Sequence, residues 1–303
     1  MMKEMMSTKE VAEYLNINEK QVYALIKAKR IPATRVTGKW IFPKKIIDEW
    51  ITSNAEKGIM DIREKSGDTG KALLASGSND PVLDILLNNI KKINPDFYIF
   101  SSSIGSKEGL RLLNEGLTDI AWCHILDPES GEYNIPYISS YLPEEKIAIV
   151  HLFYREQGFL VSPQLKHNVK EFKDLCKNNL RFVNRQKGSG TRILLDYNLN
   201  KNSINPDSID GYDNEVYTHF EVGLSILSGK SDVGIATIAI SKLLDIPFVP
   251  IVKESFDMVL KKETFFTSGV QTFIETLKSN DFRDSVRYLG DYDFNDSGKI
   301  INS

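Results

Sequence analysis

The stretch NRQKGSGTRILLD, residues 184–196, decides the fold of the larger part of the chain. It leads from a short apolar strand into an apolar helix through Gly188-Ser189-Gly190-Thr191. Backbone N–H groups in the first turn of a helix have no partner within that helix and attract anions. The stretch therefore predicts a strand–turn–helix unit whose turn faces a ligand.

Strands and helices alternate on both sides of this unit. Continuous apolar strands separated by helices are typical of a parallel sheet covered on both faces. The predicted strands are 72–76, 97–101, 119–123, 181–184, 232–236, 248–252 and 255–262. The predicted helices are 80–93, 106–116, 172–176, 191–199, 218–229, 238–244, 270–277 and 282–289.

Two stretches interrupt the alternation. Residues 124–146 predict a long loop, and residues 147–162 predict an extended strand pair. The alternation on either side of them predicts an α/β body, residues 72–303, that consists of two lobes with a hinge near 150–160 and 248–256.

Several predicted strands of this body end on small polar residues that enter a helix. Ligands of open α/β sheets bind beyond the carboxyl ends of the strands, so these ends predict a site where uncharged hydroxyl and N–H groups hold a small anion. A serine at one helix start is more often an ordinary cap, and only the convergence of several favours a ligand. The candidate ligand-binding residues are Ser78, Ser103, Ser189, Gly190, Thr191 and Thr237.

Residues 1–54 predict a separate small domain. Two capping boxes, Ser7 with Glu10 and Asn18 with Gln21, each open a helix. Residues 33–42 alternate and predict a hairpin, which a third helix follows. Two helices joined by a short turn and followed by a basic hairpin are the parts of a winged helix-turn-helix domain.

Charge distinguishes this domain from the rest of the chain. Residues 1–54 carry +4 and the remainder −7, in a chain of net charge −3. Between residues 19 and 45 lie eight basic residues and one acidic residue, a density that suits phosphate contacts with double-stranded DNA. The alternative is a helical domain whose lysines only face water. The candidate DNA-binding residues are Lys20, Gln21, Tyr23, Lys27, Arg30, Arg35, Lys39 and Trp40.

Other features argue against several classes of protein. Cys123 and Cys176 form no CxxC pair, and no His/Cys cluster predicts a metal site. The sequence opens without an apolar export signal and has no run of 18 apolar residues, which predicts a cytoplasmic protein without a membrane span. GSGTR is neither a P-loop nor GxSxG, and His124 with Asp127 predicts a loop hydrogen bond rather than a catalytic dyad, so we do not expect an enzyme.

Longer motifs in residues 1–54 and in residues 72–303 each resemble a known family of domains. The head resembles the excisionase-type helix-turn-helix domains, relatives of the mercury-resistance regulators, over STKEVAEYLNINEKQVYALIKAKRIPATRVTGKWIFPKKIIDEWI. Residues 72–300 resemble the periplasmic molybdate-binding-protein-like domain that occurs fused to such heads. The motifs of this second resemblance are HILDPESGEYNIPYI, YREQGFLVSP, RFVNRQKGSGTRILLDY, GYDNEVYTHFEV and SDVGIATIAI.

The second resemblance implies a type II periplasmic-binding-protein fold and a sensor of molybdate or tungstate. It implies that Ser78 and Ser103 are hydroxyl ligands of the first lobe, that residues 189–191 form the helix start of the second lobe, and that Tyr217 lies on a further ligand loop. The exported molybdate receptors place a tyrosine hydroxyl near the position of Thr237, and this chain has a shorter side chain there.

Two arginines near the opening stretch have alternative roles. Arg185 and Arg192 either add positive charge to the ligand site or pair with Asp196 and Glu215 on the surface. The strand-end position of Arg185 favours the ligand.

The sequence thus predicts a one-component transcriptional regulator in the cytoplasm, a homodimer or higher homo-oligomer. Residues 1–54 bind DNA, residues 55–71 form a linker, and residues 72–303 sense molybdate or tungstate without a further cofactor or a metal ion of the protein's own. Two alternatives stay open. One is an intracellular protein that binds or delivers the oxyanion, and the other is a regulator with a different effector, such as sulfate or a small carboxylate.

Overall fold

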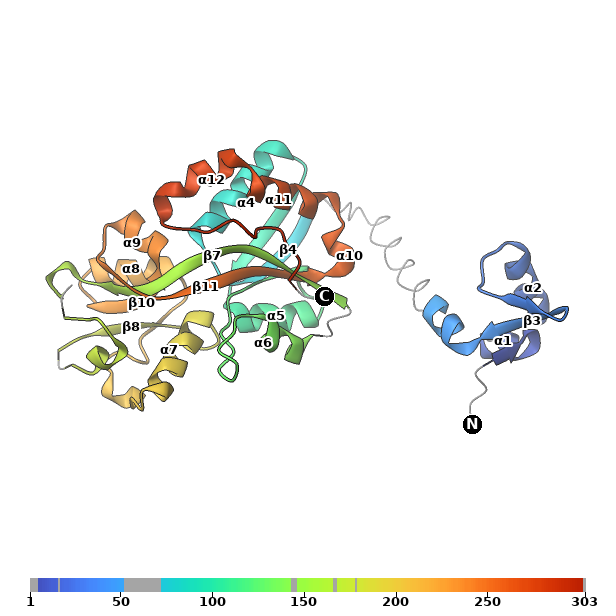
Figure 1. Cartoon of the computed structure of the whole chain (residues 1–303), viewed down its shortest axis with the longest axis horizontal. Helices are drawn as coiled ribbons and strands as arrows, with labels where there is room; N and C mark the ends of the chain where they lie inside the picture. Colours follow the sequence, from blue (N-terminus) through green and yellow to red (C-terminus); the bar gives the residue numbers. More distant parts are fainter. Residues whose placement is uncertain are drawn as a thin grey trace. The chain divides into compact units, whose positions relative to one another are not determined.

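The computed structural model describes residues 5–15, 17–51, 72–142, 146–165, 168–177 and 179–301. The predicted linker, residues 55–71, lies outside the described residues. The chain divides into two compact units, Met1–Thr69 and Gly70–Ser303, which we call the head and the body (Figure 1).

Two capped helices and a hairpin form the head. Helices α1 (Thr8–Tyr14) and α2 (Glu19–Lys27) each begin with the predicted capping box. Strands β2 (Thr34–Val36) and β3 (Lys39–Pro43) form the predicted antiparallel hairpin, and residues 44–51 are helical. The helix-turn-helix head with a β-hairpin wing is therefore present.

A third strand of the head is absent from the sequence prediction. Strand β1 (Met5–Ser7) pairs antiparallel with β3. The reason is Met6, which is buried in the core of the head beside Val11, Val22 and Phe42. Burial of one apolar side chain of this size contributes roughly 1.5–3 kcal/mol, which adds to the pairing with β3 in favouring this short strand.

The body contains one sheet of eight strands in the order β5-β4-β6-β11-β7-β10-β8-β9. Neighbours among β4, β5 and β6 are parallel, as are neighbours among β8, β9 and β10, whereas β7 and β11 run antiparallel to the strands beside them. The all-parallel sheet of the sequence prediction is therefore wrong at the centre of the sheet. The strands are β4 (Ala72–Gly77), β5 (Tyr98–Ser103), β6 (Ile120–Cys123), β7 (Ile147–Val161), β8 (Phe182–Arg185), β9 (Glu215–Val216), β10 (Val233–Thr237) and β11 (Phe248–Lys261).

Strands β7 and β11 run through the whole length of the body (Figure 1). Residues 147–162 are not a strand pair, and residues 248–252 and 255–262 are not separate strands, because each region forms one long strand and the two strands pair with each other. β11 has two irregularities in this pairing, between Pro250 and Val252 and between Phe256 and Asp257.

The two ends of these long strands belong to different hydrophobic cores. Val150 and Phe153 of β7 pack in one core with Trp122, whereas Phe159 and Val161 pack in another core with Phe182. The body therefore consists of a first lobe around β4, β5 and β6 and a second lobe around β8, β9 and β10. This confirms the mixed α/β body with a helix-turn-helix head.

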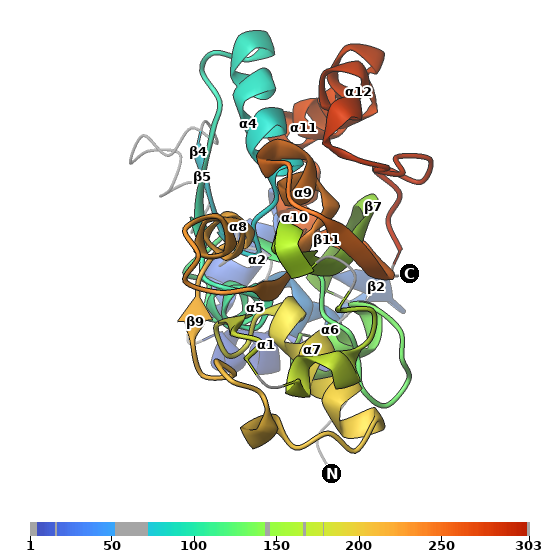
Figure 2. The ribbon, with the colours of Figure 1, turned by 90° about the vertical axis from the view of Figure 1, so that its left-hand side faces the viewer.

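Helices cover both faces of the sheet in the first lobe. α4, α11 and α12 lie together on one side, and α5 and α6 lie on the other (Figures 1 and 2). The predicted loop at 124–146 is wrong in part, because it contains α6. The helices of the body are α4 (Pro81–Ile93), α5 (Ser106–Asn114), α6 (Ile135–Tyr141), α7 (Gly190–Lys201), α8 (His219–Leu227), α9 (Ile238–Leu244), α10 (Lys262–Phe265), α11 (Ser268–Lys278) and α12 (Asn280–Val286).

Candidate functional site

Buried polar side chains meet where β7 and β11 pass from one lobe to the other. They come from the middle of these two strands, from the ends of β6 and β8 and from the start of α8. Each is at most 2% exposed. We call them the inter-lobe cluster, and its members are His124, Arg155, Gln157, Arg185, His219 and Glu254.

Two carboxylates hold Arg155. Its Nη1 lies 2.6 Å from Asp80 Oδ2, its Nε lies 2.8 Å from Glu254 Oε1, and the guanidinium carbon lies 4.5 Å from the ring centre of Phe256. Asp80 also caps α4 by accepting a hydrogen bond from the Val82 N–H. Among the described residues, Arg155 Nη2 has no hydrogen-bond partner. A buried donor without a partner is unfavourable, so a ligand oxygen would be stabilised there.

Arg185 lacks a carboxylate partner. Its Nη2 donates to the Tyr217 carbonyl at 2.7 Å and its Nε donates to Gln186 Oε1 at 3.2 Å. Within the described part of the chain, no carboxylate forms an ion pair with it, and its Nη1 has no partner. Burial and the nearby Arg155 lower the pKa of Arg185 to about 9. A buried cation without a counter-ion destabilises a protein, and an anion at Nη1 would remove that penalty.

Glu254 orients the neighbouring polar side chains. Its Oε2 lies 3.0 Å from His124 Nδ1 and accepts a hydrogen bond from Gln157 Nε2 at 2.6 Å. Burial alone would raise the pKa of Glu254, but the Arg155 guanidinium and the hydrogen bonds from His124 and Gln157 lower it, so the carboxylate is ionised. Because an ionised carboxylate only accepts hydrogen bonds, His124 Nδ1 carries the hydrogen. His124 Nε2 has no partner in the described residues.

His219 lies close to His124 but belongs to the other lobe. The two ring centres are 6.2 Å apart. Burial, Arg185 and Arg155 lower the pKa of His219 well below its usual range, which makes the ring neutral near pH 7. Both ring nitrogens of His219 are without a partner among the residues that the structure describes.

The predicted start of α7 lies against the inter-lobe cluster. Ser189 caps α7 by accepting a hydrogen bond from the Arg192 N–H. Thr191 is buried, and its hydroxyl has no partner within the described ranges. A Cβ atom on Gly190 would lie 2.0 Å from the His124 carbonyl oxygen and 2.7 Å from its ring. Only glycine therefore allows α7 to approach His124 this closely.

Two other predicted ligand residues, Ser78 and Thr237, are buried. Ser78 is buried beside Asn79, whose carbonyl accepts a hydrogen bond from Arg155 Nη1 at 3.3 Å. Thr237 is fully buried and lies opposite Gln157 in the strand register.

Two predicted ligand side chains do not reach the inter-lobe cluster. Ser103 ends the edge strand β5 and is exposed. The side chain of Tyr217 is 61% exposed, and only its carbonyl oxygen contacts Arg185.

The structure separates the roles of the two arginines near the opening stretch. Arg192 forms ion pairs with Asp196 and Glu215, each at 3.0 Å. Arg185 forms neither of these pairs and lies in the inter-lobe cluster. The site therefore contains buried charged groups in addition to the uncharged ones that the sequence predicts.

Sequence reasoning missed Arg155, Gln157, Glu254 and His219, and misassigned His124. His124 does not bond to Asp127, which accepts hydrogen bonds from Ser130 instead. The sequence contains one signal for the two residues on β7. Arg155 and Gln157 interrupt an apolar run at alternate positions, and alternate residues of a strand face the same side.

The two lobes touch each other directly beside the cluster. The Lys107 N–H of α5 donates to the Gly188 carbonyl at 3.2 Å. A Cβ atom on Gly105 would lie 3.4 Å from backbone atoms of Gly188 and Ser189. The structure is therefore a closed arrangement of the lobes.

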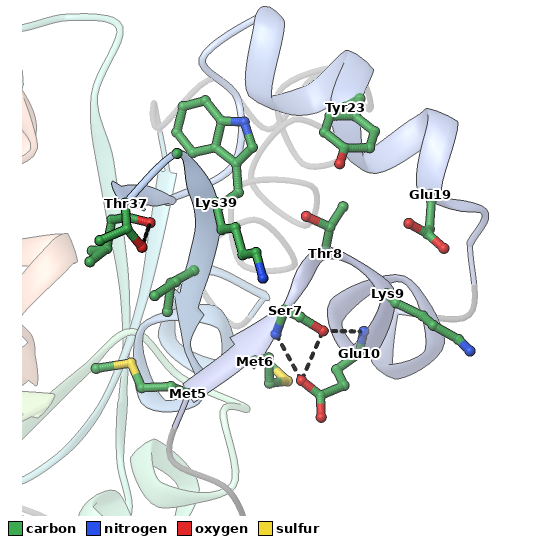
Figure 3. Close-up of a pocket in the computed structure, with 14 residues that line it drawn as sticks. Met5, Met6, Ser7, Thr8, Lys9, Glu10, Glu19, Tyr23, Thr37 and Lys39 are labelled. Atoms are coloured by element: carbon green, nitrogen blue, oxygen red, sulfur yellow. Dashed lines mark hydrogen bonds between the residues drawn. The ribbon is translucent and has the colours of Figure 1, made fainter.

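The head has a candidate site of its own. A groove of about 550 Å³ lies between the start of α1, helix α2 and the β2–β3 hairpin, and Tyr23, Lys39 and Thr8 face it (Figure 3). Tyr23 is 51% exposed. The predicted DNA-binding residues that are exposed along α2 and just beyond it are Lys20, Gln21, Tyr23, Lys27 and Arg30.

Three further DNA-binding candidates take part in the structure of the head. Gln21 Oε1 accepts a hydrogen bond from the Asn18 N–H in the capping box at 3.0 Å. Arg35 Nε donates to the Gly38 carbonyl at 3.2 Å, and the guanidinium lies 5.7 Å from the ring centre of Trp40. Trp40 is half-buried against the core of the head. Arg35 and Trp40 therefore fix the shape of the hairpin.

The described part of the chain lacks two further features. No group of three or more His, Cys, Asp and Glu residues among them could hold a metal ion. None of the helices in the described ranges combines the length and the apolar character needed to cross a membrane.

Comparison with known proteins finds similar chains and folds. The uncharacterized protein YvgK of Bacillus subtilis (strain 168) is 29% identical over 300 residues, which is 96% of each chain. A cysteine-to-serine mutant of Corynebacterium glutamicum OxyR, with bound H2O2, has a TM-score of 0.53 at 15% identity over 93% of this chain and 90% of that chain. A Clostridium perfringens protein described as a phosphate ABC transporter substrate-binding protein, with bound phosphate, has a TM-score of 0.52 at 18% identity over 76% and 99%.

Two family models match the two units of the chain. The model described as a helix-turn-helix domain matches residues 5–55, and the model described as a PBP superfamily domain matches residues 87–278. The second match spans more than half of the sequence. The chain therefore belongs to the PBP superfamily and carries a helix-turn-helix domain at its N-terminal side.

Proposed function

We propose that this protein is a one-component transcriptional regulator whose head binds DNA and whose body binds a small oxyanion, molybdate or tungstate. The observation that carries the proposal is Arg185, a buried cation between the two lobes of a PBP superfamily body that has no counter-ion among the described residues. A regulator explains the combination of a DNA-binding head with a ligand-binding body better than an enzyme does.

The closed contact between the lobes suggests how the ligand would act. An oxyanion that interacts with Arg155 on β7 and with Arg185 and α7 of the second lobe favours the closed arrangement, and a ligand shifts an equilibrium only through such a preference. In a homodimer on two DNA half-sites, closure would change the spacing of the heads. Because double-stranded DNA is the proposed partner, we place the protein in the cytoplasm.

Calorimetry on the full chain tests the identity of the oxyanion. We expect molybdate and tungstate to bind with a one-to-one stoichiometry, and sulfate and phosphate to bind at least tenfold more weakly. The resemblance of residues 72–300 to molybdate-binding domains supports this order. Equal or tighter binding of sulfate or phosphate would contradict the choice of effector and leave the oxyanion site itself standing.

One observation favours hydrogen phosphate as the alternative effector. Gln157 Oε1 and neutral His124 Nε2 are hydrogen-bond acceptors without partners among the described residues. Hydrogen phosphate has a hydroxyl group that could donate to one of them, whereas molybdate and tungstate have no hydrogen near neutral pH. The same titrations decide between the two effectors.

Binding of the full chain to a duplex of arbitrary sequence tests the head. We expect log Kobs to fall linearly with log salt concentration, and the slope to fall by roughly 0.9 for each lost phosphate contact in Lys27→Gln and in Lys39→Gln. Lys44→Gln is the matched control, because Lys44 has the same charge but is paired with Asp48 at 2.8 Å.

A flat salt response of the unmodified protein would remove the DNA-binding proposal. It would favour the alternative of an intracellular protein that binds or delivers molybdate or tungstate, with a head that contacts another protein. Equal slopes for Lys27→Gln, Lys39→Gln and Lys44→Gln would instead remove our assignment of the DNA-binding face.

A further inference from the structure

His124 and His219 face each other from different lobes. His124 follows β6 of the first lobe and His219 begins α8 of the second, with 6.2 Å between the ring centres. Both side chains are at most 1% exposed. Their three nitrogens without partners in the described residues are His124 Nε2, His219 Nδ1 and His219 Nε2.

The charged groups around His124 come from three strands. They are Glu254 on β11, Arg155 on β7 and Arg185 on β8. The helices packed against it contribute Ser106 of α5 and Gly190 of α7, which do not titrate, and His219 of α8, which does.

These surroundings keep the histidine pair neutral when no anion is bound. Burial lowers the pKa of His124, Glu254 opposes this effect, and the two arginines add to it. Among the residues that the structure describes, no carboxylate contacts either nitrogen of His219, and burial with the same two arginines lowers its pKa further. A histidine with a lowered pKa is uncharged near pH 7.

Neutral His124 is poorly matched to an oxyanion. Its Nδ1–H donates to Glu254, so its Nε2 has a lone pair that repels a ligand oxygen. A proton on Nε2 would turn this nitrogen into a donor. Molybdate and tungstate cannot supply that hydrogen, so it has to come from the solvent.

The charge balance of the buried groups also favours the uptake of a proton. Arg155 and Arg185 carry two positive charges, and Asp80 and Glu254 carry two negative charges, so the ligand-free network is neutral overall. A dianion would leave two uncompensated negative charges in a buried site, which is unfavourable. One additional proton halves that excess.

We infer that a dianionic oxyanion binds to the inter-lobe cluster together with one proton, which His124 takes up from the solvent at Nε2. The inference rests on the proposed oxyanion function. Glu254 stabilises the resulting imidazolium at Nδ1, and the ligand stabilises it at Nε2. His219 stays neutral because it has no carboxylate partner. Oxyanion binding is thereby linked to pH.

Isothermal titration calorimetry of the full chain with molybdate measures the proton directly. The titration is done near pH 7.5 in two buffers with different enthalpies of protonation. We expect the difference in observed heat to correspond to uptake of about one proton per bound ion, and the affinity to fall about tenfold for each pH unit above 7. Phosphate is unsuitable as the probe because it exchanges its own proton in this range.

Two matched variants assign the proton. In His124→Gln, we expect weaker molybdate binding, and we expect proton uptake and the pH dependence of the remaining binding to fall to near zero, because glutamine does not take up a proton. In His219→Gln, we expect uptake to remain near one proton. Nitrogen NMR of the histidine side chains in the unmodified protein provides a readout without a variant, and we expect one additional doubly protonated imidazole when molybdate is bound.

The possible results distinguish this inference from the proposed oxyanion function on which it rests. Molybdate binding without buffer dependence, uptake that persists in His124→Gln, or the absence of the doubly protonated signal would each overturn the inference while the oxyanion function stands. Failure of molybdate, tungstate, sulfate and phosphate to bind would overturn the oxyanion function itself.

Discussion

Replacing Arg185 by glutamine is expected to reduce the oxyanion affinity of the protein about thirtyfold to a few thousandfold. Truncating one partner of a buried, hydrogen-bonded charge pair costs about 2–5 kcal/mol, and 1.4 kcal/mol corresponds to a factor of ten. We expect the loss of affinity in Arg185→Gln to lie in the upper part of this range, because Arg185 has no carboxylate partner among the described residues. Calorimetry on the full chain gives the affinity.

The stability of the same variant provides a second readout. At a ligand concentration one hundred times Kd, binding stabilises a folded protein by about 2.7 kcal/mol, and we expect this thermal shift to disappear in Arg185→Gln. The ligand-free variant should melt within a few degrees of the unmodified protein, because a buried cation without a counter-ion contributes no net stability.

Arg192→Gln is the control for this experiment. It removes the same group from a position seven residues away, where the guanidinium already pairs with Asp196 and Glu215. We expect it to change the oxyanion affinity less than threefold. An affinity loss in Arg192→Gln that matches the loss in Arg185→Gln would show that general positive charge, rather than the buried guanidinium, attracts the ligand.

Replacing Gly190 by alanine is expected to prevent the closed contact between the lobes. The added Cβ would lie 2.0 Å from the carbonyl oxygen of His124, and a backbone oxygen cannot move aside as a flexible side chain can. We expect at least a tenfold loss of oxyanion affinity. We also expect that the oxyanion no longer reduces the radius of gyration measured by small-angle X-ray scattering.

Gly229→Ala controls for the general effect of adding a methyl group. Gly229 has φ +69°, and a Cβ there would have nothing within 4 Å, so alanine costs roughly 1–2 kcal/mol of backbone strain without obstructing the lobes. Its affinity should equal that of the unmodified protein. If Gly190→Ala also binds the oxyanion normally and still becomes compact, binding does not need the close approach of α7 to His124.

The start of α7 shows which parts of the site could be predicted from the sequence. A strand, a turn of small residues and a helix follow each other within thirteen residues, and the cap at Ser189 uses neighbours along the chain. Local patterns of this kind are determined by capping and backbone preferences. The same is true of both capping boxes of the head.

Strand β7 shows where such patterns stop being informative. An apolar run of this length indicates buried strand, but the partner strand β11 is almost one hundred residues later in the chain. Nothing near residues 147–161 determines whether they form one strand or two. Their single long strand follows from pairing with β11 and from burial in two separate cores.

The inter-lobe cluster depends on contacts even farther apart. His124 and Glu254 are 130 positions apart in the sequence, and their hydrogen bond exists only because β6, β7 and β11 are brought together by the fold. The sequence therefore predicts the uncharged edge of the site, which is local. Of the charged centre it predicts only Arg185, which lies in the opening stretch, and not Arg155 and Glu254, which come from distant strands.

The two irregularities in β11 lie on either side of Glu254. A bulge bends its strand locally, so we expect any rotation between the lobes to be centred on the segment that carries Glu254. When the lobes rotate, the charged groups of the inter-lobe cluster would move little because they lie near the axis. The outer helices would move farther because they lie away from it. A small displacement of the groups that bind the anion would therefore correspond to a large displacement of the outer helices.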